Sequence, residues 1–208
     1  MADAGRVITG IAKGVRLLAP GEGTRPLSDK VKQALFASLE SEFGDAWPVP
    51  FLDLFAGSGA AGIEALSRGA PRAVFVEQDE RVARIIGQNL ERAGLDRPNT
   101  EIGLEVGTAP VVRSDASRFL ERDPGSVGGP FGAVLLDPPY GDAAMLAALA
   151  RLGDADRGWL ATEAVVVAKR FWRDELPERT GVLTRTRERR FGETALTYYR
   201  PTGAEPAA

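Results

Sequence analysis

The sequence predicts an α/β protein whose doubly wound, mainly parallel sheet carries helices on both faces. From Phe51 onward, apolar runs of strand length alternate with amphipathic stretches of helical length. A glycine-rich turn at Gly57–Gly62 joins the first run to the first amphipathic stretch. With 208 residues, 44% of them hydrophobic, the chain is long enough to bury one substantial core. We therefore expect one domain with a short N-terminal extension.

The elements follow from hydrophobic periodicity. Strands are expected at 51–55, 72–77, 111–114, 132–136, 164–168, 182–188 and 194–200, which gives a seven-stranded sheet with an antiparallel C-terminal strand. Helices are expected at 60–68, 79–93, 116–122 and 142–151. Before the sheet, residues 6–18 predict a short hairpin, and Ser28 predicts the N-cap of a helix with Val31, Leu35 and Leu39 on one face.

The chain divides into three predicted segments. Residues 1–45 form an N-terminal arm and helix packed on the core, 46–202 form the main domain, and 203–208 form a disordered tail. The Gly/Pro-rich stretch 97–110 predicts a long loop, with a short strand at 100–106 as the alternative.

Composition excludes several chemistries. The chain has no Cys and no His, so it has no disulfide, no thiolate nucleophile, no Ser-His triad and no imidazole or thiolate metal ligand. We expect no metal site. No apolar run approaches the roughly 18 residues of a membrane span, and we expect a cytoplasmic monomer.

Charge is unevenly distributed along the chain. The net charge is -3, but residues 1–36 hold six Lys/Arg against three Asp/Glu, and residues 169–200 hold nine against five. These ends carry +3 and +4, whereas 37–168 carries eleven against twenty, or -9. If the fold brings the two ends together, they form a cationic face that suits nucleic acid. Ordinary solvated side chains are the alternative.

The glycine turn predicts a binding site for a nucleoside-containing cofactor. Gly57, Ser58 and Gly59 let backbone amides approach a ligand at a helix N-terminus. Glu77 ends the next strand, where a carboxylate can accept both hydroxyls of a ribose. NAD would use the same features.

Two further carboxylates help to distinguish between the possible cofactors. Asp53 lies four residues before Gly57, where its charge disfavours a pyrophosphate and favours the cationic end of S-adenosylmethionine. A carboxylate that caps the loop's own amides is the alternative. Asp115 closes the third strand and can accept a hydrogen bond from an adenine amino group, although an N-cap for the following helix explains it almost as well.

The stretch VLLDPPYGD predicts the catalytic corner. Asp137 ends the fourth strand, and ligands of open α/β sheets bind beyond the carboxyl ends of the strands. Pro138 and Pro139 stiffen the turn, so that Asp137 and the Pro138 carbonyl make two fixed acceptors for an NH2 group. Tyr140 offers a ring on which a base can stack. An ordinary turn after a strand is the alternative.

In this order, FAGSG, VEQD and DPPY resemble the motifs of amino-methyltransferases that act on an exocyclic nitrogen. The segments RVITG, GTRPLSDKVKQALF, DLFAGSGAAGIEALSRGA and RRFGETALTYYR resemble the RsmD family, which methylates guanine N2 in bacterial 16S rRNA. The resemblance implies a Rossmann-like class I methyltransferase fold and S-adenosylmethionine as cofactor. It implies that Asp137, Pro138, Pro139 and Tyr140 hold the target base. The expected cofactor contacts are Asp53, Phe55, Gly57, Ser58, Gly59, Glu77, Gln78, Asp115 and Ala116.

The expected partner is 16S rRNA, in the small ribosomal subunit or an assembly intermediate. Its phosphates are expected to contact Arg6, Lys13, Arg16, Arg25, Lys30, Lys32, Arg187, Arg189 and Arg190. Two alternatives remain: methylation of adenine N6 or cytosine N4 in DNA, because the corner requires only an NH2 group, and a nucleotide-binding module without catalysis.

Overall fold

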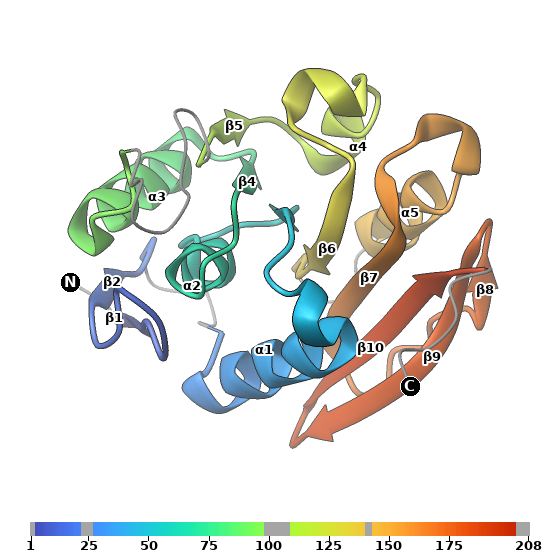
Figure 1. Ribbon diagram of the computed structural model, residues 1–208, viewed down its shortest axis with the longest axis horizontal. Helices are drawn as coiled ribbons and strands as arrows, with labels where there is room; N and C mark the ends of the chain where they lie inside the picture. Colours follow the sequence, from blue (N-terminus) through green and yellow to red (C-terminus); the bar gives the residue numbers. More distant parts are fainter. Residues whose placement is uncertain (1–2, 22–26, 98–108, 140–142, 203–208) are drawn as a thin grey trace.

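The predicted alternation of strands and helices is confirmed, in a computed structural model that describes residues 3–21, 27–97, 109–139 and 143–202 (Figure 1). The N-terminal part comprises β1 (Asp3–Arg6), β2 (Arg16–Leu18), α1 (Asp29–Phe43) and the 3-10 turn η1 (Gly44–Ala46). The alternating part comprises β3 (Phe51–Asp53), α2 (Ala60–Ser67), β4 (Ala73–Glu77), α3 (Glu80–Ala93), β5 (Val111–Arg113), α4 (Ala116–Phe119), η3 (Pro124–Val127), β6 (Phe131–Leu136), α5 (Ala143–Leu152), η4 (Ala155–Arg157) and β7 (Leu160–Phe171). The C-terminal strands are β8 (Arg179–Thr180), β9 (Leu183–Phe191) and β10 (Thr194–Pro201).

The large sheet has eight strands in the order β5-β4-β3-β6-β7-β10-β9-β8. The first five are mutually parallel, and β10, β9 and β8 each run antiparallel to the preceding strand in that order. The expected count of seven strands is therefore wrong by one. The extra strand is β8, which is only two residues long and carries no periodic pattern.

Side chains alternate along each strand, so the two faces of the sheet pack in two separate hydrophobic cores. Phe51, Phe75 and Leu135 pack in the cluster that also holds buried residues of α1, α2 and α3. Their neighbours Leu52 and Val76 pack in the cluster that holds α4 and α5. Helices thus cover both faces, as the sequence predicts for a doubly wound sheet.

The N-terminal hairpin of β1 and β2 is fastened to α2 and α3. The buried carboxylate of Glu64 accepts hydrogen bonds from the backbone amides of Ile8 and Thr9, at 2.7 and 3.0 Å. Asn89 of α3 accepts from the Leu18 amide at 2.7 Å and donates to the Leu18 carbonyl at 3.0 Å. The predicted arm is therefore seated on the core, beside α2 and α3 in Figure 1.

One helix also ends earlier than expected. Helix α4 ends at Phe119 instead of residue 122, because Asp123 caps the next turn through the Ser126 amide and Pro124 follows. The stretch 100–106, the Arg25 position, the Tyr140 position and the tail 203–208 all lie outside the described residues. Within the described part of the chain, no helix is long and apolar enough to cross a membrane.

Candidate active site

A cavity of about 630 Å³ opens at the carboxyl ends of β3, β4, β5 and β6. Its volume lies in the range of pockets that enclose whole small molecules. Of the residues expected to hold a cofactor, all except Gly59 line it: Asp53, Phe55, Gly57, Ser58, Glu77, Gln78, Asp115 and Ala116. Asp137, Pro138 and Pro139 line the same cavity. The two predicted halves of the site therefore face one space.

The glycine turn has two glycines with different physical roles. Gly57 has φ 52° and lines the cavity, and a Cβ added there would meet no atom of the described chain within 4 Å. Gly59 has φ 77°, and a Cβ there would lie 2.9 Å from a methyl of Ile86 in α3. Gly57 thus leaves space for a ligand, whereas Gly59 allows α2 and α3 to approach each other.

Glu77 holds the turn in place. Its carboxylate accepts hydrogen bonds from the Gly57 amide at 3.0 Å and from the Asp79 amide at 2.9 Å. Each carboxylate oxygen can accept a second hydrogen bond, so these contacts leave capacity for two hydroxyl donors. The side chain lies on the wall of the cavity, where a ribose is expected.

Asp53 is a buried carboxylate, 2% exposed, beneath the N-terminus of α2. It accepts a hydrogen bond from the Gly62 amide at 3.0 Å. Burial raises its pKa to about 7, the Gly62 hydrogen bond opposes the rise, and the nearby charges of Asp137 and Glu77 add to it. Asp53 therefore caps a backbone amide of the Gly57–Gly62 turn, as the alternative interpretation expects, and it also lines the cavity.

Asp115 likewise both caps a helix and lines the cavity. One of its oxygens caps α4, accepting hydrogen bonds from the Ser117 and Arg118 amides at 2.9 and 3.2 Å. The residue also lines the cavity. The N-cap that the sequence left as an alternative is present.

A lysine that the sequence reasoning missed completes the corner after β6. The Lys169 ammonium donates to a carboxylate oxygen of Asp137 at 2.6 Å, and its side chain is only 9% exposed. Burial raises the pKa of Asp137, and the charge and hydrogen bond of Lys169 oppose that rise. No sequence pattern marks Lys169, because its place depends on the register of two strands: Leu136 pairs with Ala168 in the parallel ladder, so the next residues along the chain are Asp137 and Lys169.

The residues expected to contact RNA separate into three groups. Lys13, Arg16, Lys30, Arg189 and Arg190 are exposed. Arg6 pairs with Asp29 at 3.1 Å and Arg187 with Glu42 at 2.8 Å, within the chain itself. The expectation for Lys32 is wrong, because its side chain is fully buried, donates to the Arg6 carbonyl and lies 4.0 Å from Glu64.

Metal ligands are not grouped in the described ranges of the chain. No set of three or more Asp or Glu side chains there is arranged to hold a metal ion.

Comparison with known proteins gives full-length similarities. The chain is 36% identical to "Putative rRNA methyltransferase YlbH" of Bacillus subtilis, over 95% of this chain and 100% of that protein. It is 34% identical to Ribosomal RNA small subunit methyltransferase D of Escherichia coli K12, over 93% and 88% of the two chains. The solved structure of a hypothetical protein from Thermus thermophilus superposes with a TM-score of 0.75 at 30% identity, covering 94% of this chain and 98% of that chain.

Together with these similarities, three structural features define the class of protein as a Rossmann-like methyltransferase. They are the doubly wound sheet, the glycine turn beside Glu77 and the Asp137 corner. Residues 5–200 match the model of the family described as Conserved hypothetical protein 95, and the chain belongs to that family. The resemblance to the RsmD family is thereby confirmed.

Proposed function

We propose that the protein transfers a methyl group from S-adenosylmethionine to the exocyclic N2 of a guanine in 16S rRNA. The observation that carries this is the single cavity shared by the glycine turn, Glu77 and the Asp137–Pro139 corner. The name of the Escherichia coli relative, a small-subunit rRNA methyltransferase, supports the choice of substrate. Under this proposal the protein works as a monomer in the cytoplasm, on the small subunit or an assembly intermediate.

The cavity fits the cofactor by its shape and donor set. The space beside Gly57 is open, and Glu77 can accept hydrogen bonds from ribose hydroxyls. Asp53 would face the cationic end, and Asp115 would lie near the adenine. When bound, S-adenosylmethionine supplies an electrophilic methyl group on a cationic sulfur.

At the corner, the chain's task is to orient a weak nucleophile. The lone pair of an exocyclic amine is delocalised into the base, so attack requires the nitrogen to be held in one geometry. Lys169 occupies one oxygen of Asp137 and fixes the carboxylate. The other oxygen and the Pro138 carbonyl would accept the two N–H groups and stabilise positive charge on the nitrogen. After transfer, the excess proton would leave to Asp137 or to water.

The target base must leave its stack to reach Asp137. The exposed cations Lys13, Arg16, Lys30, Arg189 and Arg190 would contact phosphates and set the orientation of the RNA.

The test is methyl transfer in vitro. Purified protein is incubated with isotope-labelled S-adenosylmethionine and with small subunits from cells lacking this gene, and the rRNA nucleosides are identified by mass spectrometry. We expect labelled N2-methylguanosine. Asp137→Ala should abolish transfer while leaving the thermal shift by S-adenosylmethionine in place. In a parallel reaction with DNA as the substrate, label in N6-methyladenine or N4-methylcytosine would instead support the alternative substrate. Stabilisation by NAD alone would remove the cofactor assignment.

A further inference from the structure

The arginines of the C-terminal strands divide into paired and unpaired groups. Arg170, Arg185, Arg187 and Arg200 each contact a carboxylate: Glu188, Glu178, Glu42 and Glu42, respectively. In contrast, Arg173, Arg189 and Arg190 are exposed and have no carboxylate partner among the described residues. Arg179 of β8 is also exposed and has no carboxylate partner among the described residues, whereas the other three lie where β7 and β9 end. Arg189 pairs with Leu196 and Arg190 with Ala195, so these two side chains project from opposite faces of β9. Charge that the fold does not neutralise is available to a partner.

Two of these unpaired arginines share one aromatic ring. The guanidinium carbon of Arg190 lies 3.6 Å from the ring centroid of Trp172, and that of Arg173 lies 4.9 Å from it. Each contact is a cation–π interaction. The two like charges are thereby held close together on a half-buried indole.

This cluster lies at the same edge of the sheet as the catalytic corner. Thr194 pairs with Phe171 on one side and with Phe191 on the other, so the ends of β7 and β9 flank the start of β10. Lys169, which contacts Asp137, precedes Trp172 by three residues of chain. At strand spacing that separation is roughly 10 Å.

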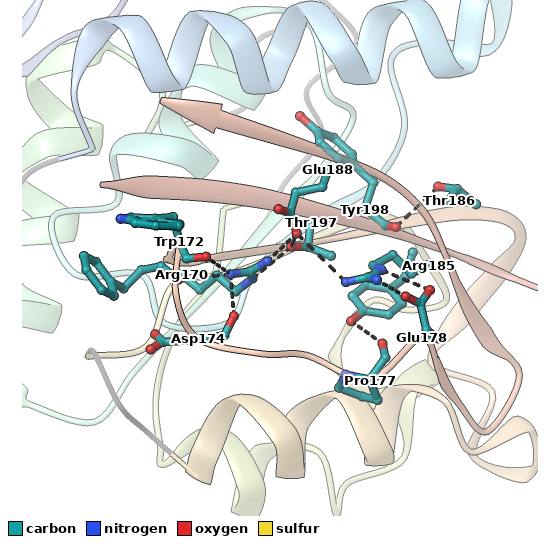
Figure 2. A network of polar contacts seen from close by, with 12 residues as sticks. Arg170, Trp172, Asp174, Pro177, Glu178, Arg185, Thr186, Glu188, Thr197 and Tyr198 are labelled. Atoms are coloured by element: carbon teal, nitrogen blue, oxygen red, sulfur yellow. Dashed lines mark hydrogen bonds and ion pairs between the residues drawn. The ribbon is translucent and has the colours of Figure 1, made fainter. Parts of the chain in front are cut away.

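A buried arginine fixes the segment that carries Trp172 and Arg173. The Arg170 guanidinium donates to the carbonyls of Phe171 and Trp172 at 3.0 and 3.1 Å and to the carbonyl of Asp174. It also donates to Thr197 and Glu188, as Figure 2 shows. The backbone on both sides of the indole is therefore held by hydrogen bonds from Arg170 to three carbonyls.

The next residues of the same segment reach the corner itself. Asp174, Glu175 and Leu176 line a second cavity of about 300 Å³ whose other walls include Pro138, Pro139 and Lys169. Residues 172–176 thus run from the cationic cluster to a cavity that the catalytic corner also lines.

We propose that Trp172, Arg173 and Arg190 form a docking surface for the single-stranded RNA that adjoins the target nucleotide. The inference rests on the proposed function, because an extruded base leaves its flanking nucleotides unpaired at this edge. Planar guanidiniums can bind phosphate in a fork and stack on bases, and the indole supplies a stacking face. We call these three residues the tip surface.

The test compares charge-reversed and control variants in RNA binding. Arg173→Glu combined with Arg190→Glu removes the two stacked cations of the tip surface. The matched control is Arg122→Glu, since Arg122 is also exposed and stacked on a ring, that of Phe119, at 5.7 Å. Arg122 lies near the opposite end of β7, because its neighbour Leu120 accepts a hydrogen bond from Trp159, just before that strand begins. The probes are a short fluorescent single-stranded RNA and protein-free 16S rRNA.

We expect the double variant to bind both RNAs about tenfold more weakly. The slope of log K against log salt should become shallower by about 1.4, from the loss of two single-strand phosphate contacts. Trp172→Leu should weaken binding about fivefold, whereas Trp172→Phe should retain most of it, because stacking depends on the ring. Arg122→Glu should leave both quantities unchanged, and the thermal shift by S-adenosylmethionine should be the same in all variants.

Unchanged RNA affinity and salt slope in the double variant would overturn the inference. So would a double variant that binds protein-free RNA normally but fails to methylate assembled subunits, because the tip surface would then contact a ribosomal protein. Failure of the proposed function has a different signature: the wild-type protein would methylate no rRNA, while the reversed arginines would still lower its affinity for RNA.

Discussion

At the scale of single residues, the site concentrates negative charge around one buried cation. Asp53, Glu77 and Asp137 line one cavity, and Lys169 lies against Asp137 on the same wall. Burial favours the protonated forms of Asp53 and Asp137, and the charges of Asp137 and Glu77 add to this effect at Asp53, whereas the Lys169 ammonium favours the ionised form of Asp137. The protonation states of Asp53 and Asp137 thus depend on their surroundings, and the pH dependence of stability and activity should reveal them.

Asp53 should make stability depend on pH. Its folded pKa of about 7 is above the value of about 3.9 for an unfolded chain. Between these values the folded state binds more protons than the unfolded state, so this residue's contribution to stability falls as pH rises and is fully lost above about pH 7. Asn at position 53 keeps an acceptor for the Gly62 amide but cannot ionise. Asp53→Asn should therefore gain thermal stability relative to wild type as pH rises from about 5 to 8. A difference in melting temperature that stays constant over this range would contradict the shifted pKa.

Lys169 should set the pH range of catalysis. It opposes the rise in the pKa of Asp137, so Lys169→Met should raise that pKa further. If transfer requires ionised Asp137, the acidic limb of the kcat profile should move upward by about 1 to 3 pH units. Lys169→Arg, which keeps the positive charge, should restore most of the profile. A variant with lower activity but an unmoved acidic limb would mean that Lys169 acts only on folding.

At the scale of elements, α2 is where the N-terminal part joins the sheet domain. Its Glu64 accepts hydrogen bonds from two backbone amides of the hairpin connection and pairs with Arg68 at 2.8 Å. Lys32 of α1 lies 4.0 Å away, with both side chains fully buried. Burial lowers the pKa of Lys32, and Glu64 opposes that change. One buried carboxylate therefore connects the hairpin, α1 and α2.

Removing that carboxylate should be costly. Glu64→Ala leaves two part-buried amides without their acceptor and the buried Lys32 ammonium without its carboxylate partner, and we expect a loss of about 3 to 5 kcal/mol in the free energy of unfolding. Adding Lys32→Met should recover part of the loss by removing the stranded charge. Glu40→Ala, which breaks the half-exposed pair with Arg68, is the control and should cost less than about 1 kcal/mol. Denaturant unfolding measures all three, and equal losses for Glu64→Ala and Glu40→Ala would refute this role of Glu64.

Sequence periodicity predicted most elements because each strand and helix buries a regular face. It missed β8, whose two residues are held by pairing with β9 alone. Sequence alone predicts that Lys32 is exposed, because charged residues usually are, but the side chain is buried beside Glu64. That contact joins residues distant in sequence and has no local pattern. Asp137 was found from its motif, whereas Lys169 requires knowing that β6 and β7 are neighbours in register.

At the scale of the whole molecule, the fold places the cavity and the tip surface along one edge of the sheet. The cavity lies beyond β3 to β6, and the tip surface lies at the ends of β7 and β9. The acidic body of the chain, with its charge of -9, explains why the net charge is -3 although the C-terminal strands carry unpaired arginines. Net charge alone therefore says little about the partner of this protein.

Nucleoside mass spectrometry of rRNA treated with the protein tests the central claim most directly. Small subunits from cells lacking this gene are incubated with the wild-type protein or with Asp137→Ala, in the presence of labelled S-adenosylmethionine. The account predicts labelled N2-methylguanosine in 16S rRNA with the wild type and none with Asp137→Ala. Label on another base, or equal labelling by the two proteins, would contradict it.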